Sequence, residues 1–149
     1  MSSLIAEVAD AVTVELNDYQ FSQTFNAQRK WRAKYDLRDL STLRVAVVPG
    51  PFTYEALDRR SDKVQIATDL VVLKRGDPDA NSEVDPIVAL GEEFLAHFRS
   101  KNLSAGSRNI VCVDPRMLVN PADAAVDPDH LHDHRTMVIV IRLTWLVRK

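Results

Sequence analysis

The sequence predicts an α+β fold, in which a mostly antiparallel sheet of about four to five strands carries two main helices on one face. Two segments, 3–17 and 85–101, place apolar residues at helical spacing, whereas other segments alternate apolar and polar residues as strands do. Segment 136–147 is apolar at most positions, which is typical of a strand that is covered on both faces. The order of helix, three strands, helix and two strands favours helices packed against one sheet.

The composition is that of one globular domain. The chain has 149 residues, of which 46% are hydrophobic, so a single domain over 1–149 can bury a sizeable core. The 19 basic and 21 acidic residues nearly cancel, which gives no bulk affinity for nucleic acid or anionic membranes. The single Cys112 cannot form an intrachain disulfide, and we see neither a secretory signal nor a run of about 20 apolar residues. We therefore expect synthesis in a reducing cytoplasm and no membrane span.

The first helix is predicted over 3–17. Its apolar residues fall on one helical face, and Ser2 or Ser3 can cap its start. The residues of that face are Leu4, Ile5, Val8, Val12 and Leu16.

Alternation over 25–35 predicts a half-buried strand, with Trp31 on its inward side. Arg29 interrupts the apolar side, so either that end is exposed or a carboxylate pairs with the guanidinium. On the other side, Lys30, Arg32 and Lys34 form a basic stripe. Because aromatic and basic side chains lie on opposite faces, the stripe is not a platform for single-stranded nucleic acid, and we interpret it as an edge facing solvent or a partner.

The next two strands are predicted to pair as a hairpin. Segment 43–49 ends at a Pro-Gly-Pro turn, and segment 64–74 alternates along its whole length. Between them, residues 50–62 are too charged for a core strand, so we predict an exposed ribbon arm or loop there.

The second half of the chain is predicted to hold a helix, a long loop and two strands. Asp85 and Pro86 are typical of an N-cap and first helical residue, and Gly91 on the apolar side suggests close packing. Residues 109–114 are predicted to form a short strand. Residues 114–134, with three prolines, are predicted to form a long loop before the central strand at 136–147.

One segment contains a set of possible metal ligands. Residues 127–134 hold three histidines and three acidic residues, which are suitable ligands for zinc, iron or manganese. His130 and His134 would lie one turn apart on a helix, but the spacing matches no complete site, so we favour a polar turn. Cys112 lies in an apolar run, and no phosphate-binding glycine loop or serine elbow occurs. We therefore expect no enzyme activity, no cofactor and no metal.

Four segments together resemble the small tail-terminator and head–tail joining proteins of tailed bacteriophages and prophages, also known as minor tail components. The segments are LRVAVVP at 43–49, YEALDRRS at 54–61, VQIATDLVVLK at 64–74 and DHRTMVIVIRLTW at 133–145. The resemblance covers nearly the whole chain.

The resemblance implies a structural virion protein that forms a ring, commonly a hexamer, at the head-proximal end of the tail. Such a ring ends tube growth and joins the tail to the neck, so its partners are other copies of itself, the tail tube protein and a neck or stopper protein. DNA would pass through its channel without specific binding. The interface residues we expect are Glu55, Asp58, Arg59 and Arg60 in the arm and Lys30, Arg32 and Lys34 in the stripe.

Several alternatives stay open. One is another neck protein of the same virion, such as a stopper or connector. A second is a small metal-binding enzyme that uses the His130–His134 cluster, and a third is a nucleic-acid-binding module that uses the stripe over 29–34. The last is a bacterial structural protein unrelated to phages.

Overall fold

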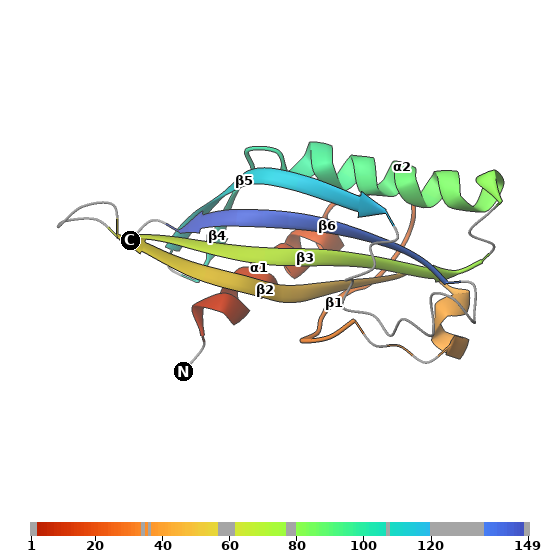
Figure 1. Ribbon diagram of the computed structural model, residues 1–149, viewed down its shortest axis with the longest axis horizontal. Coiled ribbons are helices and arrows are strands. Elements are labelled where there is room, and N and C mark those ends of the chain that lie inside the picture. Colours follow the sequence, from red (N-terminus) through yellow and green to blue (C-terminus); the bar gives the residue numbers. More distant parts are fainter. Residues whose placement is uncertain are drawn as a thin grey trace.

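The computed structural model describes residues 3–33, 35, 37–56, 62–76, 80–106, 108–119 and 136–147. Two α-helices, one short 3-10 helix and six strands make up this part of the chain (Figure 1). In chain order they are α1 (Leu4–Asp18), β1 (Ala27–Arg29), the 3-10 helix η1 (Leu37–Ser41), β2 (Arg44–Ala56), β3 (Asp62–Arg75), α2 (Asn81–Phe98), β4 (Asn102–Ala105), β5 (Arg108–Val119) and β6 (Thr136–Val147).

The six strands form one sheet in the order β1-β2-β3-β6-β5-β4. Only the β1–β2 pair is parallel, so the predicted α+β class with a mostly antiparallel sheet is confirmed. The central position predicted for 136–147 is also confirmed, because β6 pairs with β3 on one side and β5 on the other. The sheet has one strand more than predicted, because β4 is four residues long and too polar to alternate visibly.

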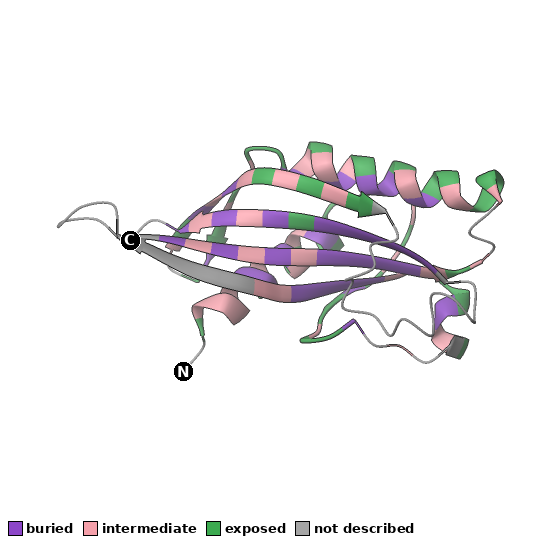
Figure 2. Ribbon diagram, viewed as in Figure 1, coloured by how far each residue is buried: buried purple, intermediate pink, exposed green. Residues whose placement is uncertain are grey.

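Both helices pack on the same face of the sheet, as predicted. One buried cluster joins Val8, Val12 and Leu16 of α1 and Leu90 and Phe94 of α2 to the strands. Its sheet members include Val45, Val47, Ile66, Leu70, Ile139, Ile141, Leu143 and Trp145 (Figure 2). At about 25 cal/mol per Å² of apolar surface, this burial is the main force that holds the two layers together.

A second, smaller core covers part of the opposite face. Leu40 of η1 and Ala33 pack there with Val71 of β3 and with Val138 and Val140 of β6. Residues 137–141 of β6 are therefore buried on both sides, which explains why each of them is apolar. The second half of β6 is not, since Arg142 is exposed and forms an ion pair with Asp69 at 2.9 Å.

Helix α1 matches its prediction closely. The Ser3 hydroxyl accepts a hydrogen bond from the Ala6 N–H at 3.1 Å, which caps the N-terminus. Thr13 Oγ1 donates to the Ala9 carbonyl at 2.8 Å on the less buried side. The helix ends after Asp18, within one residue of the predicted end.

Strand β2 is longer than predicted, and the expected stop at Pro49 is wrong. Beyond the end of β1, β2 has no described neighbour on that side, so a proline there forfeits no ladder hydrogen bond. A register shift between Pro49 and Phe52 absorbs the Pro-Gly-Pro sequence as a bulge. A Cβ on Gly50 would lie 3.0 Å from the Ala67 carbonyl oxygen, so glycine permits this close approach.

Helix α2 starts five residues earlier than predicted, with Ala80 and not Asp85 as its N-cap. Glu83 and Val84 both donate their N–H groups to the Ala80 carbonyl at 3.0 Å, and Pro86 is accommodated in the second turn. Gly91 faces the sheet, where an added Cβ would lie 2.7 Å from Met117 Sδ. The close packing predicted at Gly91 is therefore confirmed, and the group that packs against it is the side chain of Met117.

Strand β5 continues past the predicted end at Asp114. The pairing with β6 shifts register between Val113 and Arg116, and Asp114 adopts a positive φ of 54° at this bulge. The chain then pairs again as far as Val119. The first part of the segment predicted as a loop, 114–119, is therefore strand, and the rest lies outside the described residues.

Candidate interaction surfaces

The β1 edge of the sheet is closed by a side chain of α1. The Asn17 carboxamide accepts from the Ala27 N–H at 2.8 Å and donates to the Ala27 carbonyl at 3.1 Å. These two bonds replace those that a further strand would make. Edge β1 is thus protected against strand addition at Ala27.

A basic turn follows β1, and here the predicted strand over 25–35 is mostly wrong. Only Ala27–Arg29 pair as strand, and Trp31 is 63% exposed instead of facing inward. Arg29 takes the second of its two predicted alternatives, because its Nε lies 2.8 Å from Asp10 Oδ1. Lys30 Nζ lies 3.8 Å from the centroid of the Tyr35 ring, and Arg32 is exposed.

We call residues 29–32 the Trp31 turn. It combines an exposed indole with basic side chains, and tryptophan and arginine are both enriched at protein–protein interfaces. Arg29 Cζ lies 5.8 Å from the Trp31 ring centroid, which orders the turn by a cation–π contact. Lys30 and Arg32 of the predicted stripe belong to this turn, whereas Lys34 lies outside the described residues.

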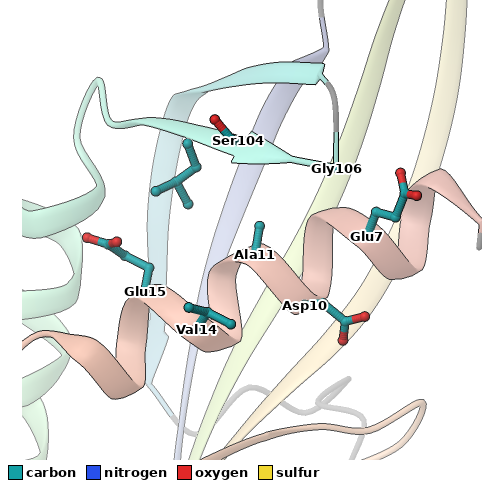
Figure 3. Close-up of a pocket in the computed structure, with 8 residues that line it drawn as sticks. Glu7, Asp10, Ala11, Val14, Glu15, Ser104 and Gly106 are labelled. Carbon is teal, nitrogen blue, oxygen red and sulfur yellow. The ribbon is translucent and has the colours of Figure 1, made fainter.

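A groove of about 360 Å³ lies between α1 and β4 at the other edge of the sheet. Figure 3 shows Glu7 and Ala11 on the side of α1 nearest β4, with Asp10 pointing away from that strand. Val14 is 58% exposed and adds an apolar surface. The lining residues are Glu7, Asp10, Ala11, Val14, Glu15, Leu103, Ser104 and Gly106, with three carboxylates and no basic side chain among these described residues.

Strand β4, which forms one wall of this groove, has backbone N–H and C=O groups that do not bond to β5. The Cys112 N–H donates to the Lys101 carbonyl at 2.9 Å, which fixes the alternation of the β4–β5 ladder. By that alternation Leu103 and Ala105 bond to β5, while Asn102 and Ser104 direct their N–H and C=O groups away from it. In contrast to β1, no described side chain closes this edge.

One end of the groove is fixed by an ion cluster between the helices. Glu15 Oε1 lies 2.8 Å from His97 Nε2 and 3.2 Å from Lys101 Nζ. Burial alone would raise the pKa of Glu15, but the hydrogen bonds from His97 and Lys101 outweigh it and hold that pKa below its usual value. Glu15 is therefore ionised at neutral pH and ties α1 to α2.

The predicted arm residues are only partly placed. Glu55 lies in β2, where its backbone pairs with Lys63 of β3. Asp58, Arg59 and Arg60 lie outside the described residues. The sequence left open whether segment 50–62 is a ribbon arm or a loop. Its described ends pair as strands, because the β2–β3 ladder continues to Ala56 and Asp62.

The reactive groups considered from the sequence are Cys112 and the His130–His134 segment, and the structure describes the first of them. Burial raises the pKa of the Cys112 thiol to about 12, so it stays protonated and unreactive at neutral pH. No three His, Cys, Asp or Glu side chains among the described residues come together as a metal site. Residues 127–134, including His130 and His134, lie outside those residues. None of the described helices is both long and apolar enough to cross a membrane.

Sequence reasoning missed the α1–β4 groove. Its one visible signal was Val14, an apolar residue that lies off the buried face of the first helix. In the sequence, Glu7 and Glu15 are ordinary residues of the polar helix face. They line a groove only because β4 lies beside α1 in the structure.

Comparisons with known proteins support the fold alone. No family model matches the chain. No curated protein matches it either. Among solved structures 21 chains are similar, and one of them, a protein whose name states no activity, has a TM-score of 0.55 at 14% sequence identity. That similarity covers 97% of this chain and 95% of the other.

Proposed function

We propose that this chain is a structural protein of a phage virion, which forms a ring at the head-proximal end of the tail. The ring ends growth of the tail tube and joins the tail to the neck. It is made in the host cytoplasm and acts without enzyme activity, cofactor or metal. Its partners are further copies of itself, six in number as the family resemblance implies, the tube protein and a neck protein.

The observation that carries this proposal is the β2–β3 ribbon. Among the described residues the last pair between β3 and β6 is Val64 with Val147, whereas β2 and β3 stay paired for two further residues, through Ala56 and Asp62 (Figure 1). A two-stranded ribbon that outruns its sheet adds little to the core of its own domain. It is suited to contact a neighbouring subunit, as is common in closed assemblies.

The sequence resemblance and the charge support the same function. Segments 43–49 and 64–74, which resemble the tail-terminator family, lie largely in β2 and β3, the two strands whose far ends form the ribbon. The formal net charge of −2 suits a channel that lets DNA pass without holding it.

Assembly of the purified protein tests the proposal. We expect light scattering and negative-stain images to show rings, either alone at high concentration or after addition of tail tubes. A protein that stays monomeric in every condition, with and without tubes, would contradict the proposed function.

Charge reversal in the arm tests the role of the ribbon. We expect Arg59→Glu with Arg60→Glu to weaken ring formation while the free energy of unfolding, measured in urea, stays within about 0.5 kcal/mol of that of the unmodified protein. Arg75→Glu is the matched control, because Arg75 is exposed at the opposite end of β3. Equal ring formation by all three proteins would remove the arm from the interface.

A further inference from the structure

The two edge strands of the sheet differ in how the rest of the chain treats their backbone groups. At β1, the Asn17 side chain occupies the N–H and C=O groups of Ala27 at 2.8 and 3.1 Å. At β4, the outward N–H and C=O groups of Asn102 and Ser104 have no partner among the described residues. Such groups at a sheet edge pair readily with another extended chain. The β4 edge is therefore open to an added strand.

The α1–β4 groove runs along this open edge. Figure 3 shows Gly106 nearer Glu7 and Ser104 nearer Glu15, so β4 runs alongside α1 in the opposite direction. Glu7, Ala11 and Glu15 follow one another at four-residue steps of the helix, which are about 6 Å long. Alternate side chains of a strand are about 6.7 Å apart. A strand added to β4 would thus meet α1 with side chains at nearly the same spacing.

We propose that the α1–β4 groove binds an extended segment of a partner protein, which pairs with β4 as an antiparallel strand and places a lysine or arginine beside Glu7. Apolar side chains of the same segment cover Val14 and Leu103. Strand addition to a free sheet edge is a recurring mode of peptide recognition, in which backbone hydrogen bonds give affinity and alternate side chains give specificity. The inference goes beyond the proposed function, because it does not require that copies of this chain form a ring.

The charge of the segment follows from which carboxylates of the groove are engaged. Asp10 and Glu15 each form an ion pair within the same chain. Glu7 forms none among the described residues, and its carboxylate lies beside Gly106, which has no side chain to cover it. No basic side chain lines the groove among those residues. A cation on the incoming segment would therefore be the partner of Glu7.

The β4–β5 ladder determines how the segment lies. The side chains of Leu103 and Ala105 point toward α1, because Ala105 is part of the main core and Leu103 packs against it. Segment residues opposite these two also face α1. A segment residue opposite Ser104 exchanges backbone hydrogen bonds with it and points its side chain away from α1. An antiparallel segment thus has its basic residue opposite Ala105, beside Glu7, and an apolar residue opposite Leu103, beside Val14.

An NMR titration of the isotope-labelled full-length protein tests this arrangement with the peptide acetyl-Lys-Thr-Val-Thr-Val-amide. In this peptide the lysine and the valines face α1, and the two threonines bond to β4. We expect the amide signals of Asn102 and Ser104 to shift at millimolar peptide. Replacing the lysine with glutamate should weaken binding at least about fivefold. Equal binding of the two peptides, or no binding at millimolar concentration, would overturn the proposal.

N-methylated peptides distinguish strand pairing from other contacts. Methyl groups on the threonine nitrogens remove the N–H groups that face β4, whereas methyl groups on the valine nitrogens lie on the side away from it. We expect the first peptide to lose binding and the second to keep it. If the two bind equally, the backbone of β4 is not used and the proposal is wrong.

Two protein variants test the two sides of the groove. Ser104→Pro removes an outward N–H that makes no bond to β5, and Ser104→Ala, which keeps this N–H, is its control. We expect binding to weaken at least about fivefold in Ser104→Pro. Glu7→Gln should weaken it at least about threefold, whereas Glu92→Gln, an exposed change on α2, should not. Circular dichroism confirms that each variant is folded. If Ser104→Pro does not fold, Glu7→Gln and the methylated peptides decide.

Sedimentation of the unmodified protein shows whether a second copy occupies the groove instead. We expect the unmodified protein and Ser104→Pro to self-associate to the same extent. Self-association that Ser104→Pro abolishes would make a second copy the occupant and would contradict the proposed partner. Rings formed equally by both proteins leave the proposed function intact, whatever the peptides show.

Discussion

Replacing Asn17 with alanine tests how the curled sheet is closed at its β1 edge. The change removes both hydrogen bonds to Ala27, of 2.8 and 3.1 Å, and leaves the N–H and C=O groups of a residue that is only 3% exposed without partners. An unsatisfied buried polar group costs about 1–3 kcal/mol. Because water reaches the half-exposed Asn17 site, we expect about 2 kcal/mol in total.

Urea unfolding measures this loss, and amide hydrogen exchange locates it. We expect the Asn17→Ala midpoint to fall and the Ala27 amide to exchange faster, while amides in β6 lose only as much protection as the whole domain. Gln20→Ala is the control, because Gln20 is exposed just beyond the helix, and surface changes usually stay within about 0.5 kcal/mol. An Asn17→Ala protein that matches this control in both measurements would refute the reasoning.

Three further predictions follow from the core and the ion cluster. Gly91→Val is expected to lower the free energy of unfolding by about 1–3 kcal/mol through overpacking against Met117, and adding Met117→Ala should recover part of that loss in chemical unfolding. The thiol of Cys112 is expected to react with Ellman's reagent at pH 8 only after the protein unfolds, since its pKa is raised to about 12; fast reaction of the folded protein would contradict this. The hydrogen bonds from His97 and Lys101 outweigh burial and lower the pKa of Glu15 in the folded state. The Glu15 carboxylate therefore stabilises the fold at pH values above its ordinary pKa of 4.5, and this stabilisation is lost as the pH falls through the lowered pKa. Glu15→Gln should therefore lose less stability than the unmodified protein between neutral and acid pH, and identical acid unfolding curves would count against the cluster.

The sequence predicts the buried elements well because their periodicity reflects the core directly. Helix α1 and strand β6 match their predicted ranges, since each buries a continuous apolar face or pair of faces. Pairing of β2 with β3 also follows from direct succession along the chain.

Features that depend on a neighbouring element are not visible in the sequence. Pro49 looks like the end of a strand, but the sheet tolerates it because β1 stops at Arg29 and leaves that part of β2 at an edge. Trp31 fits an alternating pattern, yet the chain turns away from the sheet after Arg29 and exposes it.

The candidate surfaces show the same limit. The basic residues Lys30 and Arg32 were visible as a stripe, although the stripe is a turn and not a strand. The α1–β4 groove needs β4 to lie beside α1, which joins residues about 90 positions apart in the chain. No local pattern in the sequence carries that information.

Tail length in a deletion strain tests the central claim most directly. Tube subunits that add head to tail have no intrinsic end, so a separate protein must stop their growth. The account predicts that electron microscopy of lysates from a prophage lacking this chain shows full heads beside unjoined tails of abnormal length. Empty or leaking heads beside finished tails of normal length would instead indicate a stopper, and normal tails joined to normal heads would contradict the account.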